Sequence, residues 1–120
     1  MTDPTDPIHH LAETEHWEAA RRTGRYERST LGRSLADEGF IHLSTAAQWP
    51  GVLDRYYREH EGDLVLLTVD PALLDPETEL RWEAGGPTTG ELFPHLYGPL
   101  PLGAVTATRL LTPPHGAPTG

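Results

Sequence analysis

The chain has 120 residues, of which 37% are hydrophobic and 22% charged, enough for one domain with a buried core. Its formal net charge of −9 disfavours a phosphate backbone or an anionic membrane surface, so neither nucleic acid nor a membrane is an expected partner. The absence of cysteine excludes disulfides, thiolate metal sites and cysteine nucleophiles.

Both ends of the chain are rich in proline and polar residues. We expect residues 1–7 to form a flexible leader and residues 112–120 a disordered tail, on either side of a single domain over 8–111. The leader has no signal-peptide character, and no apolar run is long enough to cross a bilayer. These features predict a cytoplasmic protein.

The first third of the domain contains a predicted strand and a predicted helix. Residues 8–13 favour a strand, and helical spacing follows over 15–23, with Thr14 as the N-cap and Gly24 as the stop. A further helical turn is predicted over 34–39. Several arginines make this region locally basic, and we interpret them as a solvated helix face: Arg21, Arg22, Arg25, Arg28 and Arg33.

The segment 40–44, FIHLS, alternates as a strand does, with Ile41 and Leu43 on one face. Ser44 or Thr45 can cap a helix that follows and runs to about residue 60. Pro50 is tolerated only in the first turn of that helix, which places its start near residue 48 or 49. Five apolar residues are expected on its buried face: Trp49, Val52, Leu53, Tyr56 and Tyr57.

Three more strands are predicted, over 63–70, 79–84 and 104–111. The resulting order has too few parallel crossovers for a doubly wound fold. An α+β domain built on a twisted, partly antiparallel sheet fits the order of elements better.

The segment 90–105, GELFPHLYGPLPLGAV, combines prolines, a histidine and a tyrosine in an apolar run. Proline restricts its own backbone and that of the residue before it, so Pro94, Pro99 and Pro101 leave the chain few conformations. We predict a rigid turn that presents His95 and Tyr97 to a pocket.

Seven histidines are the main candidates for chemistry. His10 and His42 lie in predicted strands and His95 in the predicted turn, whereas His16, His60 and His115 are expected at the surface without a role. Three interpretations of the first group remain open: a metal site, core histidines bonded to backbone, or an anion or nucleotide pocket. A metal site is the weakest of these, because the three histidines do not form a spaced pair.

Two carboxylates and two aromatic rings accompany the histidines near residue 95. Glu83 and Glu91 are the nearest carboxylates in sequence, and either could act as a general base or stabilise a developing cation. Trp82 and Tyr97 could form aromatic walls.

Five segments together resemble the domain-of-unknown-function 952 family: IHHLAE, DEGFIHLST, DLVLLTVDPALL, LRWE and ELFPHLYGPLPLGAV. The resemblance extends from about Ile8 to Leu110. That family is grouped by fold with the ADP-ribosyltransferases. The resemblance therefore implies an ADP-ribosyltransferase-like fold: a split, twisted, mostly antiparallel β-sheet with flanking helices that binds NAD in a cleft.

The resemblance also assigns roles to individual residues. His10 corresponds to a ribose-binding histidine on the first core strand, next to His9 where many relatives have tyrosine. A group on the next core strand would contact the ligand: His42, Ser44 and Thr45. Glu91 or His95 would take the catalytic place on a late strand, and Phe93 or Tyr97 would stack on the nicotinamide ring.

These assignments imply an NAD or related nucleotide as cofactor and small-molecule partner. The implied activity is ADP-ribosyl transfer or NAD glycohydrolysis, in which a carboxylate stabilises an oxocarbenium-like cation. The alternative is a non-catalytic module that holds a small ligand or a partner's peptide in the same cleft. No pattern in the sequence specifies an oligomeric state.

Overall fold

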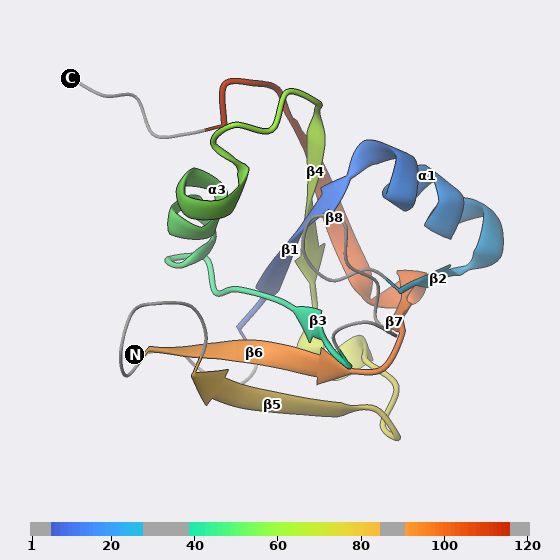
Figure 1. The fold of residues 1–120 in the computed structure, drawn as a ribbon. Helices are drawn as coiled ribbons and strands as arrows, with labels where there is room; N and C mark the ends of the chain where they lie inside the picture. Colours follow the sequence, from blue (N-terminus) through green and yellow to red (C-terminus); the bar gives the residue numbers. More distant parts are fainter. Residues whose placement is uncertain (1–5, 28–38, 85–90, 116–120) are drawn as a thin grey trace.

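The computed structural model describes residues 6–27, 39–84 and 91–115 (Figure 1). Within them the protein is an α+β fold with antiparallel strand pairing and two α-helices, as predicted for the class. The helices are α1 (Thr14–Thr23) and α3 (Trp49–Tyr57), and two short 3-10 helices cover Pro71–Leu73 and Leu102–Ala104. None of the described helices has the length and apolar character needed to cross a membrane.

The first sheet has the order β1-β4-β8 and is formed by β1 (Ile8–Glu13), β4 (Leu64–Val69) and β8 (Val105–Leu111). α1 packs against one face of it and α3 against the other (Figure 1). Alternate residues of β4 enter the two cores, Val65 and Leu67 on the α1 side and Leu64 and Leu66 on the α3 side. Two buried faces explain why this central strand is a continuous apolar run.

The second sheet has the order β3-β6-β5 and crosses below the first one in Figure 1. It is formed by β3 (Ile41–His42), β6 (Leu92–Tyr97) and β5 (Glu79–Ala84). A two-stranded ribbon of β2 (Arg25–Tyr26) and β7 (Leu100–Pro101) lies beside it.

The predicted strand 40–44 is shorter in the structure because the chain changes partner within it. Ile41 and His42 pair with β6, and the Leu43 amide still donates to the Pro94 carbonyl at 2.9 Å. Ser44 instead pairs with His9 of β1, through backbone bonds of 2.7 and 2.8 Å. This short segment therefore joins the two larger sheets. Its predicted alternation is confirmed, since Ile41 and Leu43 are both buried in the core.

The rigid turn predicted around His95 is wrong, because residues 92–97 form β6, the central strand of the second sheet. Proline is rare in a central strand because it has no amide hydrogen to donate. Pro94 is tolerated because β3 ends at His42, one residue before Leu43, which faces Pro94. Its carbonyl remains available and accepts the Leu43 amide.

Two helix boundaries and the exposure of one helical residue differ from the predictions. α1 begins at Thr14 with Glu13 at the N-cap, so Thr14 is not the cap, whereas Gly24 ends the helix as predicted, with φ of 86° and its amide on the Ala20 carbonyl. α3 begins at Trp49 as predicted but ends at Tyr57 instead of near residue 60. Tyr56 is 43% exposed, so its predicted place on the buried face is wrong.

Parts of three predicted segments lie outside the described residues: most of the leader, the helical turn at 34–39 and the end of the tail. The expected surface position of His115 is wrong. Its ring is buried, and Nε2 lies 2.7 Å from the Gly62 carbonyl.

Candidate functional site

The strand register of the second sheet places two histidines and a carboxylate on one face. His42 of β3 pairs directly with His95 of β6, and their ring centroids are 5.1 Å apart. Glu83 of β5 lies opposite Phe93, two residues from His95 on the same face. We call this group the imidazole–carboxylate cluster; its members are Phe40, His42, Glu83, His95 and Tyr97.

Glu83 is the shared hydrogen-bond acceptor of the cluster. Its Oε1 accepts from His95 Nδ1 at 2.9 Å and from the Tyr97 hydroxyl. These two bonds, that from Tyr97 being the stronger influence, hold the pKa of Glu83 below its usual range. The same carboxylate raises the pKa of Tyr97, because ionisation of the phenol would lose the bond and place two negative charges together.

The bond to Glu83 determines which nitrogen of His95 is available for chemistry. A carboxylate only accepts, so Nδ1 carries the hydrogen, and in the neutral ring Nε2 has a free lone pair. Nε2 is buried and has no hydrogen-bond partner among the described residues. A carboxylate that orients an imidazole with a free lone pair is an arrangement suited to accepting a proton or a ligand hydroxyl.

Aromatic and cationic groups surround this pair. The Phe40 ring stacks on His95 with centroids 4.2 Å apart. The Arg81 guanidinium lies 4.9 Å from the centroid of the Tyr97 ring and pairs with Glu79 at 2.7 Å. Phe40 therefore covers the imidazole, and Arg81 places a positive charge next to the cluster.

His10 bonds to the backbone of one cluster residue, His42, and both of its ring nitrogens are engaged in hydrogen bonds. Nδ1 donates to the His42 carbonyl at 2.7 Å, which leaves Nε2 to accept from the Tyr26 hydroxyl at 3.0 Å. Burial lowers the pKa of His10 to about 4. Both nitrogens are occupied by the protein, so His10 fixes the backbone that carries His42.

The His42 ring is less enclosed and stays neutral at physiological pH. Burial, followed by the neighbouring His95 and His10, lowers the pKa of His42 to about 4. The ring also lies 5.1 Å from the Phe93 ring. A neutral imidazole can both donate and accept a hydrogen bond, as a sugar hydroxyl requires.

The structure brings together most of the predicted ligand-binding residues. His10, His42 and Ser44 line a gap of only about 10 Å³, which is too small for more than one water molecule. His42 contacts Phe93 and His95, and Glu83 links His95 to Tyr97.

Two predicted residues lie elsewhere. Glu91 precedes β6 and interacts with Gln48 Nε2 at 3.3 Å, while Glu83 is the carboxylate bonded to His95. Thr45 takes part in the start of α3, where its hydroxyl accepts from the Gln48 amide and its own amide donates to the Gln48 side chain. This reciprocal pair has the pattern of a capping box and closes the turn at 46–48 that leads into α3.

The sequence alone did not identify two hydrogen-bond partners of the histidines: Glu83, which accepts from His95, and Tyr26, which bonds to His10. Glu83 was one of two candidate carboxylates, and only the β5–β6 register selects it. Tyr26 lies in a two-residue strand with no local signal. Among the described residues, no group of three histidine, aspartate or glutamate side chains is arranged to hold a metal ion.

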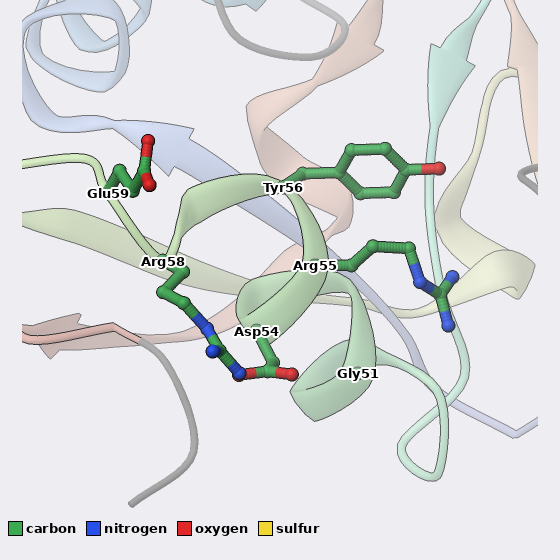
Figure 2. A pocket seen from close by; sticks show the side chains of 6 residues that line it. All are labelled: Gly51, Asp54, Arg55, Tyr56, Arg58 and Glu59. Atoms are coloured by element: carbon green, nitrogen blue, oxygen red, sulfur yellow. The ribbon is translucent and has the colours of Figure 1, made fainter. Parts of the chain in front are cut away.

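A hollow of about 530 Å³ lies along α3, away from the cluster, and is lined by Gly51, Asp54, Arg55, Tyr56, Arg58 and Glu59 (Figure 2). Arg58 pairs with Asp54 one turn earlier. Arg55 and Tyr56 extend away from that pair and Glu59 points to another side, so the polar groups do not converge on one point. The hollow lacks the convergent polar groups of a binding site.

Comparison with known proteins places the chain in a family. The family model described as "Protein of unknown function (DUF952)" matches residues 11–108. The crystal structure of protein CC0527 from Caulobacter crescentus is similar, with a TM-score of 0.75 and 33% identity over 94% of this chain and 93% of that one. A double methionine variant of CC0527 gives a TM-score of 0.74 at the same identity and coverage. No curated protein matches the chain. The chain therefore belongs to the DUF952 family.

Proposed function

We propose that this protein has an ADP-ribosyltransferase-like activity: it binds an NAD-type nucleotide at the imidazole–carboxylate cluster and cleaves the bond between nicotinamide and ribose. The observation that supports this most directly is the pair of Glu83 and His95, with the buried Nε2 of His95 lacking a partner among the described residues. A buried acceptor without a bond is costly in a core, and it is useful where a ligand supplies the hydrogen.

Each group has a role in the proposed reaction. When the ribose–nicotinamide bond breaks, its electron pair goes to the ring nitrogen, and nicotinamide leaves as a neutral molecule. The carboxylate of Glu83 stabilises the oxocarbenium-like cation that develops on the ribose. A water molecule or an acceptor hydroxyl then attacks the sugar carbon and gives its proton to His95 Nε2. Arg81 offers the nearby positive charge that a phosphate of the nucleotide needs. Because Phe40 stacks on His95, its ring must move when the nucleotide binds.

The test is incubation of NAD with the protein, with free nicotinamide measured by mass spectrometry and binding by calorimetry. We expect Glu83→Gln to bind NAD but to release nicotinamide at least about 100-fold more slowly, because it loses the charge that stabilises the cation. His95→Asn should slow release similarly. Glu61→Gln, at an exposed position, is the matched control and should behave as wild type.

Absence of NAD binding by the wild type would overturn the proposal, as would full activity of Glu83→Gln. A second candidate is a non-catalytic binding module that uses the same cluster. It is favoured by the closed packing beneath the cluster, where His10 is fully bonded and the remaining gap is about 10 Å³. Measurable binding without release of nicotinamide by the wild type would support the module.

A further inference from the structure

A second hollow, of about 350 Å³, lies on the α3 side of the first sheet. It is lined by Asp6, Pro7, His9, Thr68 and the turn at 45–47. Its volume is in the range of small-molecule sites. None of its lining residues belongs to the imidazole–carboxylate cluster.

The position of this hollow follows from where α3 stops covering the sheet. On the α3 face, β1 and β4 present successive cross-strand pairs, and Leu11–Leu66 is packed under the helix. The next pair, His9–Thr68, is polar and lies beside the turn that precedes α3. The sheet therefore changes from an apolar to a hydrogen-bonding floor at the point where the hollow begins.

The floor offers hydrogen-bonding groups without positive charge. His9 Nδ1 lies 3.3 Å from Thr68 Oγ1, and partial burial lowers the pKa of His9, so the ring is neutral at physiological pH. No other hydrogen bond of the His9 ring occurs among the described residues, so Nε2 remains for a ligand. Pro7, Ala46 and Ala47 provide apolar walls.

The charges around the hollow define the class of ligand. Among the described residues that line it there is no lysine or arginine, and the one charged residue of that set is Asp6. An anion would therefore find no cationic side chain among these residues, whereas a flat uncharged ring could pack on the apolar walls and bond to His9 along one edge.

We propose that this hollow is a binding site for a small uncharged heterocycle with a polar edge, such as a purine base, held by His9 and Thr68 between the start of β1 and the 45–47 turn. The site is separate from the imidazole–carboxylate cluster and does not depend on the function proposed there.

The test uses adenine and adenosine as probes with the full chain, followed by amide chemical shifts in NMR titrations. We expect saturable shifts at residues 8–9, 45–47 and 68. AMP, whose phosphate would meet no cationic side chain among the described lining residues, should bind at least several-fold more weakly than adenosine. Shifts that are absent at millimolar probe, or that map only to other residues, would overturn the proposal, as would tighter binding of AMP.

Three variants test the contacts. Ala47→Trp fills the hollow and should weaken adenosine binding at least about 10-fold, while Thr112→Trp, at an exposed position beside the opposite end of β4, should have no effect. His9→Phe keeps a ring and Thr68→Val keeps the side-chain shape, and each should weaken binding without the steric change. If all three folded variants bind as wild type does, the assignment is wrong, whatever the outcome of the NAD experiment.

Discussion

At the scale of single residues, the feature that organises the candidate site is the carboxylate of Glu83. It accepts from both His95 and Tyr97, so the orientation of two side chains depends on one charge. The Glu83 side chain is 36% exposed, which means that water screens these bonds. We therefore expect its substitution to change the titration of Tyr97 more than the stability of the fold.

The pKa of the Tyr97 phenol depends on the charge of Glu83. Glu83→Gln should lower the pKa of Tyr97 from its raised value toward 10.0, because a neutral amide accepts a weaker hydrogen bond from the phenol than the carboxylate does and no longer repels the phenolate. Ultraviolet titration would measure this change, with Tyr97→Phe used to identify the signal. Glu91→Gln is the matched control, and an equal effect of both variants would contradict the role of Glu83.

The same residues show what the sequence could and could not predict about the site. The apolar surroundings of His10, His42 and His95 in the sequence were sufficient to single them out. In the structure His10 bonds to the backbone of His42, and the His42 ring lies next to that of His95. The choice between Glu83 and Glu91 depends on the register of β5 against β6, which is set by tertiary packing. The two hydrogen bonds of the His10 ring could not be predicted either, because its partners are distant in the sequence. His42 lies 32 residues away and Tyr26 lies 16 residues away.

At the scale of elements, local patterns predicted the strands and helices better than the proline-rich segment. The long strands follow from periodicity, the end of α1 from Gly24 and the start of α3 from Pro50. The strand at residues 92–97 could not be predicted from local patterns, because a central strand tolerates Pro94 only where the neighbouring strand β3 ends. β3 ends there because Ser44 pairs with His9 of β1 and no longer with β6, and His9 is distant from Ser44 in the sequence.

The start of α3 allows a prediction about Thr45. Thr45→Ala removes the hydroxyl that accepts the Gln48 amide, so we expect a loss of about 1 kcal/mol in the free energy of unfolding. Urea denaturation would measure this loss. Thr112→Ala, at an exposed position after β8, is the control. A loss no larger than that of the control would show that the capping box contributes nothing.

The turn after β6 allows a prediction about packing between elements. A Cβ at Gly98 would lie 2.7 Å from Thr78 Cγ2, closer than atoms can approach. Gly98→Ala should therefore destabilise the protein by roughly 1–3 kcal/mol. Thr78→Ala removes both Cγ2 and Oγ1, of which the second would lie 3.1 Å from the added Cβ, so the double variant should regain most of the loss. Equal unfolding midpoints of the single and double variants would contradict this explanation.

At the scale of the whole molecule, the short segment 41–44 couples the two larger sheets. It pairs with β6 and with β1, and His10 bonds from the first sheet to the backbone of His42 in the second. The interface between the sheets thus contains imidazoles that must stay neutral. A protonated ring there would lose its acceptor nitrogen and place a charge in a buried site.

This arrangement predicts how stability depends on pH. The folded-state pKa values of His10 and His42 are about 4, below the ordinary 6.5, so between these values the unfolded chain binds more protons than the folded one. Stability should be full above pH 6.5 and should fall as the pH drops toward 4, by up to roughly 3 kcal/mol for each histidine. His9, whose pKa is also lowered by burial, acts in the same direction. Below the ordinary glutamate value of 4.5, protonation of Glu83 adds a further loss, because its folded-state pKa is lowered too.

Urea denaturation at a series of pH values would measure this dependence. Replacing one of the two histidines, as in His42→Gln, should reduce the slope of the unfolding free energy between pH 6.5 and 4, because one proton fewer is taken up on unfolding. The range about one unit or more above pH 6.5 is the internal control, because there these histidines are almost fully deprotonated in the folded and in the unfolded chain and contribute little slope in either protein. A wild-type stability that is constant or rises as the pH falls through this window would mean that the two sheets do not meet through neutral, buried imidazoles.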